Sequence, residues 1–308
     1  MMGVSIKKAN YALRANEAFL ILHESMMGVS IKKANSALCA NEAFLMYYIT
    51  VVKRGDALLG YKGRDVEVIA LDGRKCLVAA CDSCGGAGSK EFDVVKVPPY
   101  ITGRFTSRVS LLEILATAAK PLLLTVASCS DPHPTTTGIL EGVKDELKSL
   151  NLSETPVVVS SEKNIPTSQT GLGITVVGIC ERESLRIATS LPGDELYCLG
   201  LPKVGSEVVI HDDLEIAHGT HILELLTIPG VHDIIPVGSR GIRKEAESLA
   251  SELSCLFVPA TLVKVNLDKS AGPSTCLIFT CTSGFIPPVF LPTPIFKIGR
   301  LQINETQN

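Results

Sequence analysis

Apolar residues beyond about position 50 fall into short runs separated by turn residues, and this pattern predicts strands alternating with helices. Residues 66–71 and 76–81 predict a β-hairpin, because the Asp-Gly dipeptide at 72–73 is a common two-residue turn. Apolar positions three and four residues apart predict helices over 106–119 and 137–150. Short apolar runs around these helices predict three buried strands, at 122–126, 157–159 and 173–178.

The pattern continues beyond a weak boundary near residues 180–182, so we expect two domains, residues 51–180 and 181–308. The Pro-rich stretch at 283–294 predicts no regular element. The elements expected after the boundary are a strand at 207–210, helices at 217–226 and 243–253, a strand at 275–280 and a last edge strand at 295–301.

A near-identical repeat opens the chain, because residues 1–20 and 26–45 differ at only two positions. Both copies have a helix-forming composition, so we treat residues 1–50 as a duplicated helical leader that is peripheral to the fold. One repeat is too few for a solenoid. It indicates a recent duplication or an upstream false start, with Met26 as the ancestral start, or else an added docking helix. We expect the first copy to be dispensable.

The composition excludes several function classes. The net charge is −3 and Trp is absent, which argues against a nucleic-acid partner. No apolar run reaches the roughly 18 residues of a membrane span, and the first 25 residues do not form a clear signal peptide. Ten cysteines are dispersed through mostly apolar segments, which is typical of reduced thiols in the cytoplasm.

The segment from Cys81 to Lys90 carries the strongest candidate chemistry. We expect the strand to end at Asp82, which could hold Mg²⁺, followed by a glycine-rich loop and Lys90, which could approach phosphates. The spacing is neither Walker A nor the Rossmann fingerprint. Simpler readings are a glycine-rich turn capped by Asp82, an exposed Lys90–Glu91 ion pair, and cysteines 81 and 84 as small buried hydrophobes rather than zinc or redox ligands.

Four segments in order resemble the aminoimidazole ribonucleotide synthetase superfamily, which includes thiamine-monophosphate kinase and selenophosphate synthetase. Gly63-Arg64-Asp65 is similar to G-D-D, and Asp82 to Lys90 is similar to D-G-V-G-T-K. Residues 103–121 resemble a helix ending N-D-x-x-A-x-G-A-x-P, and Ser160 to Pro166 resembles G-G-E-T-A-E-M-P. The resemblance covers roughly residues 51–302. Within it, residues 81–86, 164–167, 169–173 and 270–273 resemble the α-ribazole kinase branch.

The resemblance implies a two-domain α+β fold with mixed and antiparallel sheets, and an N-terminal domain that binds ATP and Mg²⁺, often across a homodimer interface. It implies phosphoryl transfer to the 5′-hydroxyl of α-ribazole in cobamide salvage. The roles implied for single residues are Mg²⁺ binding by Asp65, Asp82 and Glu113, phosphate binding by Gly85, Gly86, Gly88 and Lys90, and catalytic positioning by Asp82, Glu162 and Asn164.

Some positions depart from the superfamily patterns. Arg64 stands where G-D-D has its first Asp, and Glu113 stands where an Asp is usual, with Leu112 before it in place of Asn. Ala118 replaces a helix glycine. These departures argue against thiamine-phosphate kinase activity and leave open a degenerate, poorly active enzyme. The alternatives to α-ribazole kinase are another ATP-dependent enzyme of the superfamily, either thiamine-phosphate kinase-like or synthetase-like, and a degenerate nucleotide-binding scaffold.

Overall fold

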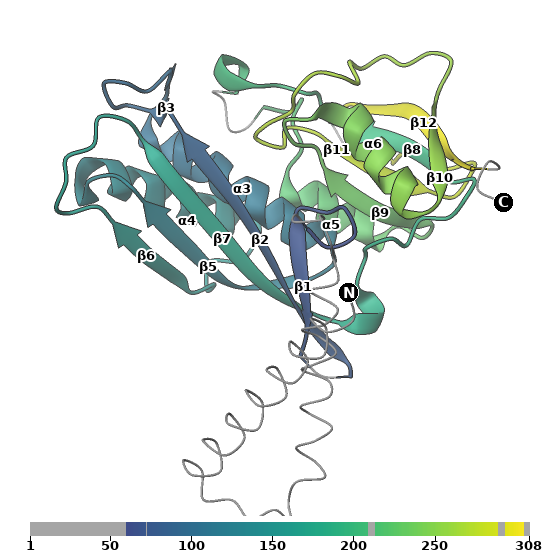
Figure 1. Ribbon diagram of the computed structural model, residues 1–308, viewed down its shortest axis with the longest axis horizontal. Helices are drawn as coiled ribbons and strands as arrows, with labels where there is room; N and C mark the ends of the chain where they lie inside the picture. The colour runs from purple at the N-terminus through teal and green to yellow at the C-terminus, as the bar shows by residue number, and fades with distance from the viewer. Residues whose placement is uncertain (1–59, 72, 209–212, 289–292, 305–308) are drawn as a thin grey trace, which may run out of the picture. The chain divides into compact units, whose positions relative to one another are not determined.

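Two five-stranded sheets organise the described part of the chain (Figure 1). The computed structural model describes residues 60–71, 73–208, 213–288 and 293–304, which belong to one compact unit. The leader predicted over residues 1–50 lies outside the described residues. None of the described helices is long and apolar enough to cross a membrane.

The first sheet has the strand order β1-β2-β7-β5-β6 and is antiparallel except for the parallel pair β5–β6. All of its strands precede Arg182. Their bounds are β1 Val66–Ala70, β2 Lys75–Gly85, β5 Lys120–Ser128, β6 Val157–Ser161 and β7 Gly171–Glu181. The predicted hairpin and the three predicted strands are therefore confirmed. Two short strands, β3 (Ala87–Gly88) and β4 (Val95–Lys96), pair in parallel beside it.

The second sheet has the order β10-β12-β8-β11-β9 and is antiparallel throughout. Its strands are β8 Glu195–Leu199, β9 Val231–Pro236, β10 Cys255–Pro259, β11 Leu277–Cys281 and β12 Ile295–Ile303. The prediction that 295–301 forms an edge strand was wrong, because the unpredicted β10 pairs outside β12. The predicted strand at 207–210 lies partly outside the described residues, and its described start belongs to the 3₁₀ turn η4 (Gly205–Glu207).

Four longer helices and two further short turns complete the fold: α3 Pro99–Ala116, α4 Thr137–Ser149, α5 Gly219–Thr227, α6 Gly241–Glu252, η2 Pro132–Thr136 and η3 Arg182–Ser184. The four predicted helices are confirmed. The first begins at Pro99, well before the predicted 106, because proline at the first helical position has a preset φ and needs no hydrogen-bond partner. The predicted α+β class is confirmed, whereas the domain division near residue 180 stays a prediction.

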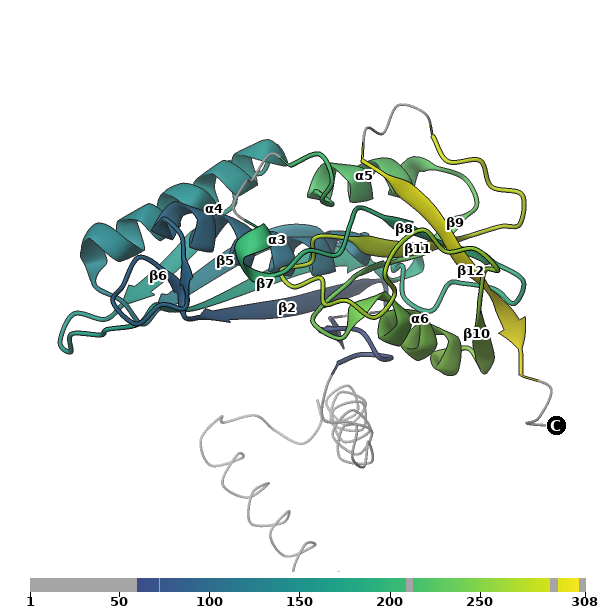
Figure 2. The ribbon, with the colours of Figure 1, turned by 90° about the horizontal axis from the view of Figure 1, so that it is seen from above.

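Helix α3 lies at the centre of the packing. It contacts the first sheet, α4, α5 and the second-sheet strand β9. Glycines let α3 and α4 cross closely, since a Cβ added at Gly103 would lie 2.1 Å from the backbone oxygen of Ile139. A Cβ added at Gly142 would lie at the same distance from the Tyr100 carbonyl oxygen. Figure 2 shows α3 and α4 on one side of the first sheet.

The two sheets differ in how they are covered. In β8 and β11, alternate residues join a core facing α3 and α5 and a core facing α6, so the second sheet is buried on both faces. In β7 of the first sheet, buried residues alternate with half-buried ones. Within the described residues, the helices therefore cover one face of the first sheet. The opposite face carries apolar side chains, among them Ile69, Leu77, Leu123, Val158 and Val177.

Candidate functional site

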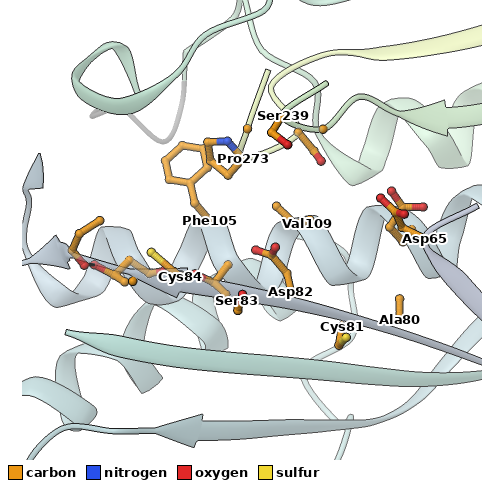
Figure 3. Close-up of a pocket in the computed structure, with 18 of the residues that line it drawn as sticks. Asp65, Ala80, Cys81, Asp82, Ser83, Cys84, Phe105, Val109, Ser239 and Pro273 are labelled. Atoms are coloured by element: carbon orange, nitrogen blue, oxygen red, sulfur yellow. Dashed lines mark hydrogen bonds between the residues drawn. The ribbon is translucent and has the colours of Figure 1, made fainter. Parts of the chain in front are cut away.

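A cavity of about 860 Å³ lies beside the free end of β2 (Figure 3). Strand β1 pairs with β2 only as far as Ala80, so β1 leaves the edge of β2 from residue 81 to 85 unpaired. Helix α3 supplies a second wall, and the loops at 238–239 and 272–274 line it from the second half of the chain. Topology alone therefore brings four separate segments to one cavity.

The register of the hairpin brings Asp65 and Asp82 to the same cavity. Val66 pairs with Ala80, so Asp65 comes just before the first pair and Asp82 comes two residues after it. Both residues line the cavity. Asp82 lies inside β2, which continues to Gly85, so the prediction that the strand ends at residue 82 was wrong. Pairing with β7 extends the strand, because Gly85 still faces Gly171.

The environment of Asp82 perturbs its acidity. Burial raises the pKa of Asp82 to about 6, although a hydrogen bond from the Ser83 backbone opposes the shift and the charge of Asp65 adds to it. Figure 3 shows Asp82 reaching from β2 toward the side of the cavity where Phe105 and Pro273 lie. A carboxylate that is costly to ionise and faces a cavity is typical of a functional site.

Glu113 reaches the same cavity from α3 and is only 6% exposed. Burial raises its pKa to about 8, although Arg64 pulls it down. The Arg64 Nη2 atom lies 3.6 Å from Glu113 Oε2, and both side chains are buried. The departure at position 64 therefore places a guanidinium against a predicted metal ligand.

The described residues contain no group of three or more Asp, Glu, His or Cys side chains placed to share one metal ion. Asp65, Asp82 and Glu113 all line the cavity, but they do not form one three-carboxylate site, since Arg64 pairs with Glu113. Mg²⁺ is commonly held by one or two carboxylates together with substrate phosphates and water. Asp65 and Asp82 fit that donor set, because both line the cavity and the charge of Asp65 helps to raise the pKa of Asp82.

The glycine-rich segment splits between the cavity and the adjoining loop. Gly85 lines the cavity, and a Cβ added there would meet nothing within 4 Å. Gly86 and Gly88 do not line it. Gly86 has a φ of +72°, and a Cβ at Gly88 would clash with the Thr170 hydroxyl at 2.3 Å. Backbone conformation explains the glycine at position 86, and close packing explains the one at position 88. Their predicted phosphate contacts stay predictions.

Lys90 is held by a partner that the sequence did not predict, since the predicted partners were a phosphate and Glu91. Its Nζ donates to Asp131 Oδ1 at 2.7 Å and to the Thr167 carbonyl oxygen at 3.0 Å, rather than pairing with Glu91. It does not line the cavity. Although burial raises the pKa of Asp131, hydrogen bonds from Lys90 and Thr135 lower it to about 2. The ion pair ties the β3 region to the loop after β5, and the bond to Thr167 ties it to the loop before β7.

Glu162 and Asn164 lie in the loop that follows β6, away from the cavity lining. The Glu162 carboxylate accepts hydrogen bonds from the backbone N–H groups of Asn164 and Ile165, at 2.7 and 3.1 Å. These bonds lower the pKa of Glu162. The carboxylate thus organises its own loop, and a catalytic role for either residue stays a prediction.

Several cavity residues were not among the predicted site residues. Gly238 and Ser239 precede α6, and the loop 272–274 lines the cavity beside them, since the Ala271 N–H donates to the Gly238 carbonyl oxygen at 3.2 Å. Their signal in the sequence was the glycine-rich loop before a predicted helix. Phe105, which is 5% exposed, packs with Val97 and Val208 at an apolar end of the cavity. Nothing in the local pattern separates such residues from ordinary core.

The charged side chains among the described residues that line the cavity are all acidic: Asp65, Glu67, Asp82 and Glu113. Among the lining residues, positive potential comes from the backbone, and behind them the Arg64 guanidinium lies against Glu113. Helix α6 begins at Gly241 next to the lining residues Gly238 and Ser239, and the N-terminus of a helix carries partial positive charge. An anionic ligand in this cavity therefore needs cations or backbone amides to hold it.

Comparisons with known proteins point to one fold. No family model matches the chain, and no curated protein matches it in sequence. AaThiL complexed with AMPPCP and TMP is similar over 90% of this chain and 94% of that chain, with a TM-score of 0.56 and 14% identity. The thiamine-monophosphate kinase of Stenotrophomonas maltophilia covers 82% and 91%, with a TM-score of 0.52 and 15% identity.

A second group of similar structures comes from a larger enzyme. PurL of Thermotoga maritima complexed with AMPPCP matches 89% of this chain but 42% of its own chain, with a TM-score of 0.55 and 15% identity. Such identities establish the fold and not the reaction. The chain has the aminoimidazole ribonucleotide synthetase-like fold, which thiamine-monophosphate kinase and PurL share.

Proposed function

We propose that this protein is an ATP-dependent small-molecule kinase that phosphorylates the 5′-hydroxyl of α-ribazole. The observation that carries the proposal is the cavity lined by Asp65 just before β1, Asp82 within β2 and Glu113 of α3. It occurs in a fold whose solved neighbours include complexes with AMPPCP and with ATP. Phosphoryl transfer depends on positioning and electrostatic stabilisation more than on covalent chemistry, and such a cavity supplies both.

The chain's residues divide the work between the two ends of the cavity. The apolar end, with Val97, Phe105, Val208 and Pro273, suits a flat heterocycle and excludes water from it. Asp65 and Asp82 would hold Mg²⁺, which when bound neutralises charge on phosphate oxygens. The amides before α6 stabilise further negative charge.

Asp82 has a second role in this proposal. A carboxylate with a pKa near 6 is a better proton acceptor at neutral pH than an ordinary one. Its free oxygen orients the acceptor hydroxyl and takes its proton as phosphoryl transfer proceeds. The assignment of α-ribazole rests on the resemblance of residues 81–86, 164–167, 169–173 and 270–273 to that branch.

A nucleotide-binding scaffold is the second candidate, and two observations favour it. The buried pair Arg64–Glu113 removes a predicted metal ligand, and Lys90 is held by Asp131 outside the cavity. A site with these features could bind a nucleotide without efficient transfer. A thiamine-phosphate kinase-like activity is the third outcome that the test below separates.

We further propose a homodimer through the uncovered face of the first sheet. That face carries Leu77, Leu123 and Val177, and apolar patches of this kind usually mark an interaction site. Ser83 and Thr175 belong to the same face and also line the cavity. A second copy seated there would extend the cavity wall, and a role for the exposed loop of Glu162 and Asn164 would then involve the second copy.

The nine described cysteines are free, which supports a reducing compartment, and we propose that the protein is cytoplasmic.

The dimer is tested by sedimentation equilibrium of wild type and Val177→Lys. We expect a dimer and a monomer respectively, because a buried unpaired charge is costly. Glu141→Gln, on an exposed position of α4, is the control. A monomeric wild type would contradict the proposal.

The kinase is tested by incubating purified protein with ATP and Mg²⁺ and either α-ribazole or thiamine monophosphate. Phosphorylation of α-ribazole, lost in Asp82→Asn and kept in Glu141→Gln, is the expected result. Phosphorylation of thiamine monophosphate alone would replace the acceptor. ATP binding without transfer would favour the scaffold, and no ATP binding by wild type would overturn the nucleotide site itself.

A further inference from the structure

Arg64 lies beside the carboxylates of the cavity, and the proposed reaction gives its positive charge no role. It is 5% exposed, and its Nε, Nη1 and Nη2 atoms have no hydrogen-bond partner among the described residues. Glu113 Oε2, which faces it at 3.6 Å, also accepts no hydrogen bond there. Buried polar atoms are nearly always hydrogen-bonded, so this group of orphaned atoms calls for an explanation.

Carboxylates lie on two sides of the Arg64 guanidinium. Glu113 of α3 is on the side of the large cavity. On the other side, a small cavity of about 10 Å³ is lined by Arg64, Asp233 of β9 and Glu245 of α6. Asp233 Oδ1 is a buried oxygen without a hydrogen-bond partner in the described structure, and Glu245 is 5% exposed. Arg64 therefore pairs with Glu113 on α3 and shares the small cavity with Asp233 and Glu245. Burial raises the pKa of Glu245, and the charges of Arg240, which pairs with it, and of Arg64 oppose that rise.

Charge counting shows what Arg64 does to the cavity. When a cation draws Glu113 into its ionised form, Arg64 cancels the charge of that carboxylate, and Asp65 and Asp82 carry the remaining −2, which matches one divalent cation. The fourth lining carboxylate, Glu67, is left out of the count, because Asp65, and not Glu67, is among the charges that raise the pKa of Asp82 and Glu113. Arginine keeps its charge at any physiological pH, so its contribution is permanent.

We propose that Arg64 is a built-in counter-ion that takes the place of a second divalent cation beside Glu113, leaving one cation position, at Asp65 and Asp82. The inference rests on the proposed function only for its use of Mg²⁺ at that position. Arg64 acts through Glu113, so it is a positioning residue. It holds the Glu113 carboxylate away from the cation.

The test is a Mn²⁺ titration of the full chain without nucleotide, followed by electron paramagnetic resonance of the free ion. We expect one Mn²⁺ per wild-type chain and none in Asp82→Asn at the same concentrations. Arg64→Lys, which keeps the charge, should bind one. Arg64→Gln frees Glu113 and should bind two, and the double variant Arg64→Gln/Glu113→Gln should return to one.

Thermal unfolding provides a second readout. The melting temperature of Arg64→Gln should fall below that of wild type in EDTA and recover with Mn²⁺. The melting temperature of the double variant should recover without metal. If Arg64→Gln does not fold, recovery of folding in the double variant supports the counter-ion role, and failure of both variants overturns it. Two Mn²⁺ on wild type, or one on Arg64→Gln, also overturns it. Wild type that binds one Mn²⁺ but no ATP leaves this inference standing and removes the kinase.

Discussion

Two buried glutamates meet arginines around α3, and their surroundings differ sharply. Glu146 of α4 accepts hydrogen bonds from Arg108 at 2.8 and 2.9 Å and from Arg104 at 3.0 Å. Glu113 faces a single arginine, Arg64, at 3.6 Å, and its Oε2 atom accepts no hydrogen bond in the described structure. One carboxylate is fully engaged between two helices, and the other is left incomplete beside a cavity.

The acidities follow from this difference. Burial raises the pKa of both carboxyl groups, but Arg108 and Arg104 more than offset it at Glu146 and lower its pKa. At Glu113, Arg64 offsets burial only partly, and the pKa stays at about 8. Well-bonded buried ion pairs fix structure, whereas under-satisfied ones are typical of sites that await a ligand. The Glu146 cluster is therefore structural, and the Glu113 pair belongs to the site.

The largest expected effect is on the structural cluster. Glu146→Gln leaves two buried guanidinium groups without their shared anion, and we expect a loss of about 3–5 kcal/mol in the free energy of unfolding. Urea unfolding followed by circular dichroism measures it, with Glu141→Gln as the exposed control on the same helix. Equal losses of unfolding free energy in Glu146→Gln and Glu141→Gln would contradict a structural role of the Glu146 cluster.

Acid should act on the same region through His221. Its Nδ1 accepts from the His218 backbone N–H at 3.0 Å, and its Nε2 lies 3.1 Å from the Thr293 hydroxyl. Burial, together with the charges of His218 and Arg108, lowers the pKa of His221 to about 4. The unfolded chain thus binds the proton first, and stability present above pH 6.5 is lost as the pH falls toward 4.

This loss amounts to about 3 kcal/mol, at roughly 1.4 kcal/mol per pKa unit. Unfolding free energies of wild type and His221→Gln between pH 7 and 4 measure it, because the other titrating groups cancel in the difference. A wild-type minus variant difference that stays constant over this range would show that His221 is not held neutral.

A smaller effect is expected at the site. At pH 6 the free protein holds Glu113 mostly protonated, since burial raises its pKa to about 8. Glu113→Gln then exchanges one neutral group for another, and the unfolding free energy should change by under about 1 kcal/mol. The same urea titration measures it. A loss as large as that of Glu146→Gln would make Glu113 structural as well.

The smallest effect is expected at Lys90. Its partner Asp131 has a side chain that is 34% exposed, so water screens the pair, and Lys90→Met should cost at most about 1 kcal/mol. Because Asp131 holds Lys90 outside the cavity, the Lys90→Met variant should keep an ATP dissociation constant within about threefold of the wild-type value. Weakening beyond about tenfold would instead support the phosphate contact that the sequence predicted.

The sequence predicted the first half of the chain well because its signals are local. The alternation in β2 and β7 and the spacing in α4 reflect one buried face each, whereas α3 is buried nearly all round. Strands β8 and β9, buried on nearly every residue, lack that alternation and were missed. The edge assignment of β12 failed because strand order depends on long-range pairing with β10, which no local pattern encodes.

The candidate site was predictable where chemistry coincides with a motif. Asp65, Asp82, Gly85 and Glu113 all line the cavity. Lys90 does not, because Asp131, forty-one residues away, competes for it. The partner of Arg64 was equally hidden, since only the packing of the turn before β1 against α3 brings it to Glu113. Sequence indicates which groups can react, and the fold decides which of them meet.

The most direct test of the account is calorimetric titration of ATP with Mg²⁺ into wild type and Asp82→Asn, with Glu141→Gln as control. We predict that wild type and control bind alike and that Asp82→Asn binds at least about tenfold more weakly, a difference of ~1.4 kcal/mol or more. Equal binding by all three proteins, or none by wild type, would contradict the assignment of this cavity as the nucleotide site.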